Sequence, residues 1–124
     1  METKALVVDS SMKVRQNIAR SLKEIDVRSI VEANDGNEAM ELFKTGTYGI
    51  LFAEYNTPTN SGDTLVSAIR KINKSLPIIA TVPQSKKMAE IKKQCPSATD
   101  YLTTPFTTEQ LRAKVEECCP TLAG

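Results

Sequence analysis

The chain has 124 residues, of which 40% are hydrophobic, and this length and composition are typical of one globular domain covering residues 1–124. Sixteen basic and fifteen acidic residues leave a net charge of +1, which argues against the clustered basic surface of a nucleic-acid-binding protein. No apolar run approaches the roughly 20 residues that span a bilayer, and the first residues carry no signal-peptide pattern, so we expect a cytoplasmic protein without a membrane segment.

Residue composition also narrows the chemistry. Histidine is absent, which removes the commonest general base and metal ligand. The three cysteines, Cys95, Cys118 and Cys119, are odd in number and lack C-x-x-C spacing, so on their own they form neither a disulfide framework nor a zinc site. Redox sensing through Cys118 and Cys119 stays open as a minor alternative.

A strand followed by a helix is predicted at the start of the chain. Residues 4–8 form a short, β-branched apolar run that ends at Asp9. Either Ser10 or Ser11 can cap the helix that follows. The inward face of this helix is expected to carry Met12, Val14, Ile18, Ala19 and Leu22.

A second strand and helix follow. The strand is predicted over residues 28–33, and the turn formers at 34–36 end it. Asp35 and Glu38 have the spacing of a capping box for the next helix, which Gly46 terminates. The inward face of this helix is expected to carry Ala39, Met40, Leu42 and Phe43.

The third strand ends in a single carboxylate. Residues 49–53 are almost entirely apolar, and Glu54 follows them directly, ahead of a polar loop that begins with Asn56 and Thr57. An apolar run bounded by turn formers predicts a strand that is buried on both faces. Ligands of doubly wound α/β domains bind at the C-terminal ends of such strands, so we expect Glu54 to lie at the functional site.

The second half of the chain repeats the alternation. A third helix should bury Leu65, Val66, Ile69 and Ile72. A fourth strand over residues 78–82 stops at Pro83, and a weakly apolar helix is predicted over about 85–94. A short strand at 100–102 precedes the last helix, for which Thr107 and Gln110 form a capping box. Five strands alternating with five helices predict a (βα)5 fold, with helices on both faces of a parallel sheet.

Several short stretches together resemble the CheY-like receiver domain of bacterial and archaeal response regulators. They are Leu-Val-Val-Asp-Ser-Ser at 6–11, Glu-Ala-Asn-Asp-Gly at 32–36, Glu-Tyr-Asn-Thr-Pro at 54–58, Leu-Pro-Ile-Ile at 76–79 and Asp-Tyr-Leu-Thr-Thr-Pro-Phe at 100–106. The resemblance implies a flavodoxin-like fold with strand order 2-1-3-4-5. It also implies Mg²⁺-dependent phosphoryl transfer from a histidine kinase to an aspartate after strand three, within a two-component system or phosphorelay.

The chemistry of that family needs particular side chains at five positions, and this chain keeps one of them. Asp9 stands at the first of the two metal-binding acids. Ser10 takes the place of the second acid, Glu54 that of the phosphoacceptor aspartate, Val82 that of a hydroxyl residue and Thr104 that of a lysine. Phosphoryl transfer depends on positioning and on neutralising the phosphoryl oxygens, so these departures predict a pseudo-receiver that does not accept phosphate.

Glu54 has other interpretations. It is a constitutive mimic of the phosphorylated state if its carboxylate replaces a phosphoryl group, although that group carries about −1.5 to −2 charge on three oxygens. The hydroxyl and lysine that read the phosphoryl group in the family are missing here, which favours a pocket frozen in one state. A solvated carboxylate without a role is the third interpretation.

The pocket also suggests weak metal binding. Asp9 and Glu54 should approach each other without an intervening lysine, which raises the pKa of at least one carboxylate. Together with Asn56 they are candidates for weak Mg²⁺ binding, and no other cofactor is expected.

The resemblance assigns the partner surface to helix four, strand five and helix five. Tyr101 has the position of the family's switch aromatic, and without a hydroxyl at Val82 it should be uncoupled from the pocket. Helix four carries the lysines Lys86, Lys87, Lys92 and Lys93. These fit an acidic signalling partner, such as a histidine kinase or a downstream effector, or a second copy of the domain. Pro105 is a candidate for a cis peptide bond, as in the family.

We therefore expect a signalling module that acts by protein–protein interaction and is not an enzyme. A receiver that is still phosphorylated by an unusual route is the alternative. A flavodoxin-type cofactor binder is disfavoured, because residues 9–13 do not form a glycine-rich phosphate-binding loop.

Overall fold

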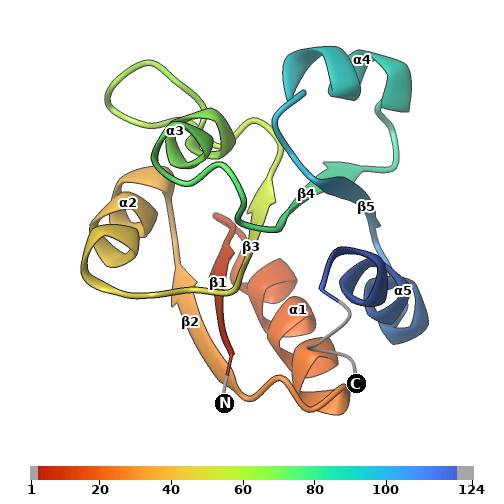
Figure 1. The fold of residues 1–124 in the computed structure, drawn as a ribbon. Helices are drawn as coiled ribbons and strands as arrows, with labels where there is room; N and C mark the ends of the chain where they lie inside the picture. The colour runs from red at the N-terminus through yellow and green to blue at the C-terminus, as the bar shows by residue number, and fades with distance from the viewer. Residues whose placement is uncertain (1–2, 120–124) are drawn as a thin grey trace.

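The structure is a computed structural model that describes residues 3–119. Its elements are β1 (Lys4–Val8), α1 (Met12–Glu24), β2 (Ser29–Ala33), α2 (Gly36–Thr45), β3 (Ile50–Glu54), α3 (Leu65–Ile72), β4 (Ile78–Pro83), α4 (Met88–Gln94), β5 (Asp100–Thr104) and α5 (Thr108–Cys118). All strand pairs are parallel, in the order β2-β1-β3-β4-β5 (Figure 1). The expected flavodoxin-like fold and strand order are confirmed.

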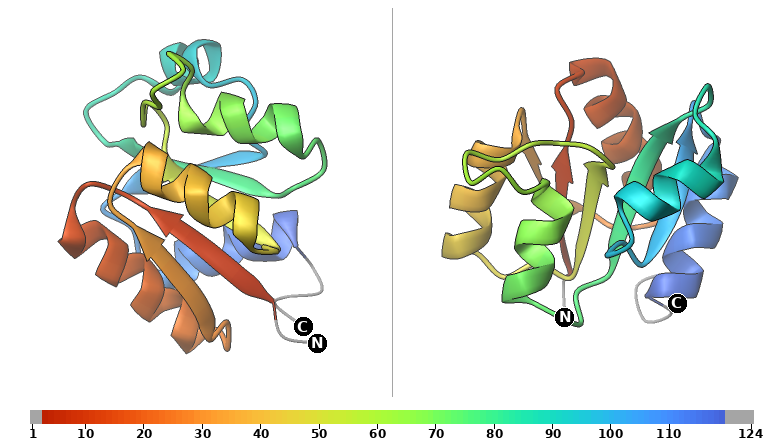
Figure 2. Two further views of the ribbon diagram at one scale, coloured as in Figure 1. Left: turned by 90° about the vertical axis from the view of Figure 1, so that its left-hand side faces the viewer. Right: turned by 90° about the horizontal axis from the view of Figure 1, so that it is seen from above.

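Helices cover both faces of the sheet, as the two views in Figure 2 show. Side chains of a strand alternate between faces, and β3 supplies both cores. Ile50 and Phe52 pack with residues of α1 and α5 in one cluster. Leu51 and Ala53 pack with residues of α2, α3 and α4 in the other. This strand, buried on both faces, carries Glu54 at its end.

Side-chain caps fix where the helices begin. Thr107 and Gln110 form a complete capping box at the start of α5, as the spacing predicts. At the start of α2, Asp35 Oδ1 accepts a hydrogen bond of 2.8 Å from the backbone N–H of Glu38. The Glu38 carboxylate accepts from the backbone N–H of Asn34 instead of that of Asp35, so the second half of the predicted box is displaced by one residue.

Three local predictions were wrong. Met12 is 60% exposed and Ile72 is 58% exposed, although both were expected to face inward. Each lies at an end of its helix, since Met12 is the first residue of α1 and Ile72 the last residue of α3. The fourth helix begins at Met88 and not near residue 85, because a turn occupies the preceding residues and Lys87 offers no side-chain cap. Within residues 3–119, no helix combines the length and apolar character needed to cross a membrane.

Candidate functional site

The C-terminal ends of β1 and β3 bring two carboxylates to one edge of the sheet. Val8 pairs with Ala53 in the parallel ladder, so the residues that follow, Asp9 and Glu54, are neighbours. Asp9 is only 6% exposed, and Glu54 is half-buried at the last position of β3. The strand ends therefore place these two acids where a doubly wound domain binds its ligands.

A cavity of about 390 Å³ opens beside Glu54, and we call it the acid pocket. Its lining comes from the loops after β1, β2 and β3 and comprises Ser10, Asn34, Asp35, Glu54, Asn56, Thr57 and Pro58. Asp35, which the sequence indicated only as a helix cap, adds a carboxylate to this lining. Among the described residues, no group of three or more His, Cys, Asp or Glu side chains is arranged to hold a metal ion.

A buried arginine lies next to Asp9, and the sequence analysis missed it. Arg15 is 8% exposed, and its Nη1 donates to the backbone carbonyl of Asp9 at 2.7 Å. Its Nε donates to Glu32 Oε1 at 3.3 Å, which ties β2 to the same corner. The available signal was a charged residue on the helix face that also carries Ile18 and Leu22, because a buried charge needs partners.

The position of the family's hydroxyl residue offers no donor. Val82 is 1% exposed and belongs to the core cluster under α2, α3 and α4. Thr81 is the neighbouring residue on β4 that has a hydroxyl, and strand alternation places its side chain on the face of the sheet opposite to that of Val82. It is also buried, with 2% exposure. Val82 therefore presents no hydroxyl group to Glu54, whereas Thr81 is the residue of β4 that pairs with Glu54 in the parallel ladder.

Thr104, at the position of the family's lysine, brings no cation to the site. Its Oγ1 donates to the backbone carbonyl of Val82 at 3.4 Å, so the hydroxyl is directed to β4. The Thr104–Pro105 peptide bond is cis. The ion pairs found within residues 3–119 include neither Asp9 nor Glu54.

Two effects disfavour the ionised form of Glu54. Burial raises the pKa of its carboxyl group, and the neighbouring charge of Asp9 raises that pKa further. A second metal-binding acid at Ser10 would add to this repulsion, and a lysine at Thr104 would relieve it.

The substitution Glu54→Gln is expected to stabilise the fold at neutral pH, because glutamine keeps the shape and removes the disfavoured charge. An acid with a raised folded-state pKa binds more protons when folded than when unfolded. The contribution of such a carboxyl group to the stability of the fold is therefore most favourable below its pKa in the unfolded state, about 4.3. This contribution declines as the pH rises through the pKa of the group in the folded state. The Tm of Glu54→Gln should exceed that of the parent near pH ~7, with the difference vanishing below about pH 4. Equal Tm values at neutral pH would contradict this account.

The loop after β3 is held against the start of α2. The backbone N–H of Asn60 donates to Asn37 Oδ1 at 2.9 Å, and Asn37 Nδ2 donates to Asn60 Oδ1 at 3.0 Å. Gly36 is in close contact with this loop, since a Cβ there would overlap the carbonyl oxygen of Pro58. The part of the acid pocket formed by Thr57 and Pro58 is thus positioned by α2.

Tyr101 is anchored away from the acid pocket. Its hydroxyl donates to the backbone carbonyl of Cys95, the C-cap of α4, at 2.7 Å. Lys92 Nζ lies 6.0 Å from the centroid of the Tyr101 ring, within cation–π range. The lysines that the sequence analysis singled out on and before α4, namely Lys86, Lys87, Lys92 and Lys93, are all exposed.

The cysteines have little thiolate character. Burial raises the pKa of the Cys119 thiol to about 11, with a further contribution from Cys118. Burial also raises the thiol pKa of Cys95 and Cys118. Because the thiolate is the reactive form, these values weigh against redox sensing.

The fold and the acid pocket together define the class of the molecule as a doubly wound α/β domain of the receiver type. The model of the response regulator receiver domain matches residues 5–116. The chain belongs to this family, whose members are signalling modules of two-component systems.

Known proteins of the same kind resemble the whole chain. The chemotaxis protein CheY of Pseudomonas aeruginosa is 28% identical over 116 residues, covering 92% of this chain and 94% of that protein. A CheY homolog of Campylobacter jejuni is 31% identical over 124 residues, covering 98% of this chain and 95% of that protein. A putative response regulator from Chloroflexus aurantiacus superimposes with a TM-score of 0.83 at 25% identity, covering 100% of both chains. CheY4 of Vibrio cholerae superimposes with a TM-score of 0.81 at 25% identity, covering 95% of this chain and 99% of CheY4.

Proposed function

We propose that this receiver domain is a pseudo-receiver that is not phosphorylated and signals by binding a partner protein. The observation that carries the proposal is the set of side chains around Glu54. Val82 offers no donor, and the Thr104 hydroxyl is directed to a β4 carbonyl. Within residues 3–119, no lysine forms an ion pair with Asp9 or Glu54. A phosphoryl group on Glu54 would lack a hydroxyl donor at position 82 and a cation at position 104, and such groups stabilise the charge in phosphoryl transfer.

The same observations weigh against Glu54 as a permanent phospho-mimic. A mimic transmits a signal only if other groups move in response to its charge. Tyr101, at the switch position, is instead bonded to the end of α4, and Val82 has no polar atom in its side chain to move toward a carboxylate. A pocket frozen in one state therefore fits better than a constitutively active one. The domain then works as a binding module without catalytic activity.

The proposed partner surface consists of α4, β5 and α5. Four exposed lysines on and before α4 give the α4 side of this surface an excess of positive charge over Glu90: Lys86, Lys87, Lys92 and Lys93. The α5 side carries the exposed acids Glu109, Glu116 and Glu117. On β5 and α5, Lys114 is already paired with Asp100 at 3.2 Å. The α4 side of the surface suits an acidic region of a signalling protein, such as a histidine kinase or an effector, with a second copy of the chain as the other candidate.

Acetyl phosphate tests the proposal directly. After incubation with acetyl phosphate and Mg²⁺, the intact mass of the protein should be unchanged. A stoichiometric gain of one phosphoryl group, lost in Glu54→Gln, would establish the alternative of phosphorylation by an unusual route. In a pull-down from the native host, the untreated protein should capture a partner, and a Lys92→Glu/Lys93→Glu variant should not.

We further propose weak Mg²⁺ binding at Asp9, Glu54 and Asn56. Two carboxylates and an amide oxygen suit a cation that keeps several water ligands. Asp9 Oδ1 already accepts from the backbone N–H of Ser11, which limits its strength as a ligand. The receiver TrrA of Thermotoga maritima, with a TM-score of 0.78 and 26% identity, was solved in complex with Mg²⁺ and BeF.

Calorimetric titration with Mg²⁺ or Mn²⁺ should therefore give a weak signal. In Asp9→Ala the affinity for Mg²⁺ should fall by at least about tenfold, because Asp9 is a proposed ligand. Even the loss of a residue that only hydrogen-bonds to a metal ligand lowers metal affinity by that factor. Identical titrations of the parent and of Asp9→Ala would remove the metal site.

A further inference from the structure

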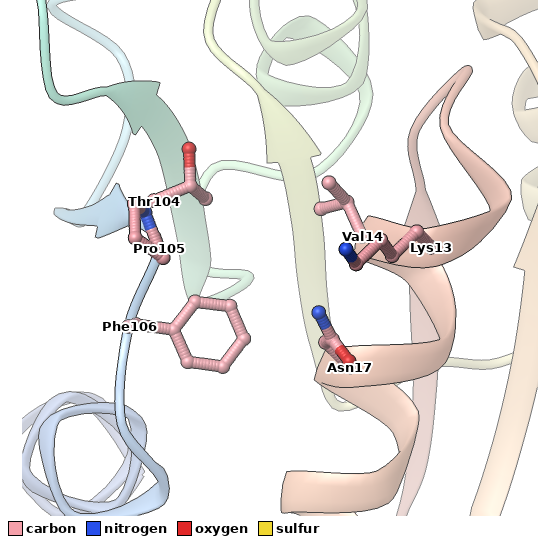
Figure 3. A pocket seen from close by; sticks show the side chains of 6 residues that line it. All are labelled: Lys13, Val14, Asn17, Thr104, Pro105 and Phe106. Carbon is pink, nitrogen blue, oxygen red and sulfur yellow. The ribbon is translucent and has the colours of Figure 1, made fainter.

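A second cavity, separate from the acid pocket, lies between the start of α1 and the loop that joins β5 to α5 (Figure 3). Its volume is about 290 Å³. The lining comprises Lys13, Val14, Asn17, Thr104, Pro105 and Phe106. We call it the α1–β5 cavity. Small-molecule sites start at about this size, around 300 Å³, and combine apolar walls with a few polar groups.

The walls of the α1–β5 cavity are apolar and anchored to the core. Val14 and Phe106 are partly buried and pack against the cluster formed with α1 and α5. In Figure 3 the Phe106 ring and the Val14 side chain stand on opposite sides of the opening, with Pro105 next to the ring. A flat or branched apolar body would be in contact with protein on two sides.

The polar groups of the cavity all suit an anion. Lys13 is exposed and takes part in none of the ion pairs found within residues 3–119, and in Figure 3 its side chain reaches past Val14 to the α1 side of the opening. Asn17 Oδ1 accepts from Arg20 Nη2 at 3.0 Å, which leaves the amide N–H groups of Asn17 to donate. Among the described residues, no carboxylate belongs to the lining, whereas Asp35 and Glu54 line the acid pocket.

We propose that the α1–β5 cavity binds a small organic carboxylate with an aromatic or branched apolar body. The carboxylate accepts from Lys13 Nζ and from the Asn17 amide, and the body packs between Val14 and Phe106. A cation is excluded by the charge of Lys13, and a nucleotide is too large for this volume. This proposal does not depend on whether Glu54 accepts phosphate, because the two cavities share no lining residue.

Benzoate is the probe for the test, with ¹⁵N–¹H NMR spectra of the full chain as the readout. Benzoate should cause saturable shifts confined to the amides of residues 13–17 and of Thr104 and Phe106. Benzyl alcohol, which lacks the charge, and acetate, which lacks the apolar body, should each bind more weakly. Lys13→Gln should weaken benzoate binding by about tenfold, the value of one charge-assisted hydrogen bond.

Lys23→Gln is the matched control, because Lys23 is an exposed lysine in the last turn of the same helix and does not line the cavity. It should leave the benzoate affinity unchanged. The proposal is overturned if Lys13→Gln and Lys23→Gln bind benzoate equally well, if the shifts map to the lysines of α4, or if they fail to saturate. Equal affinity for benzoate and benzyl alcohol would also overturn it.

Discussion

The four-position variant Ser10→Asp/Glu54→Asp/Val82→Thr/Thr104→Lys is expected to take one phosphoryl group from acetyl phosphate in the presence of Mg²⁺. These substitutions supply the second metal-binding acid, the nucleophile, the hydroxyl donor and the cation that the parent chain lacks. The β-sheet edge that would hold them is already formed, since Asp9 and position 54 are neighbours across β1 and β3. Intact-mass measurement should show a stoichiometric gain that the parent protein does not show.

The controls separate the individual contributions. Glu54→Asp alone should stay unmodified, because a nucleophile without its charge-stabilising partners gains little. Omitting Thr104→Lys from the four should slow phosphorylation by about 10²- to 10³-fold, the usual cost of one lost stabilising group. Val82→Thr puts a hydroxyl at a position that is 1% exposed, so each variant needs a thermal unfolding curve to verify its fold. A folded four-position variant that remains unmodified would show that the acid pocket is inactive for another reason.

The substitution Gly36→Ala is expected to lower the free energy of unfolding by about 1–3 kcal/mol, the usual cost of overfilling a packed site. The new Cβ would overlap the carbonyl oxygen of Pro58, a backbone atom that cannot rotate away. The loop must then separate from α2, which strains the reciprocal hydrogen bonds between Asn37 and Asn60. Urea unfolding measures the effect as a lower midpoint at constant slope.

Glu41→Ala is the control for Gly36→Ala, because it also introduces alanine into α2 but at an exposed position. Its free energy of unfolding should stay within about 0.5 kcal/mol of the parent. If Gly36→Ala unfolds at the same urea concentration as the parent, the contact between the loop and α2 is looser than described. Gly36→Ala should also show altered NMR shifts at Thr57, which lines the acid pocket.

Much of the fold could be predicted because local and global signals agree in this chain. The run of Ile50 to Ala53 is fully buried, as its apolar composition indicates, and the acid after it marks the C-terminal edge of the sheet. The capping box of Thr107 and Gln110 also predicts where α5 begins. Local signals do not predict the strand order, because it depends on contacts between segments that are distant in the sequence. It was inferred from the family resemblance and not from periodicity.

The features that were missed depend on tertiary surroundings. A helical pattern gives the side of the helix on which Met12 and Ile72 lie, but not whether other elements cover the ends of the helices, where both residues are exposed. Arg15 has two partners, the Glu32 side chain on β2 and the backbone carbonyl of Asp9. The spacing of residues along a helix indicates neither of them. The hydrogen bond from Thr104 to the Val82 carbonyl likewise depends on the register of β4 and β5.

The anchored Tyr101 has a consequence for how such a module is controlled. Under the proposed function, the hydrogen bond from the Tyr101 hydroxyl to the C-cap of α4 keeps the proposed partner surface in one shape, whatever happens upstream. By mass action, the occupancy of the complex then follows the abundance of the two proteins and their affinity. Under the proposed function, regulation moves from covalent modification to synthesis and turnover: the cell sets the output by how many copies of this chain it makes and keeps.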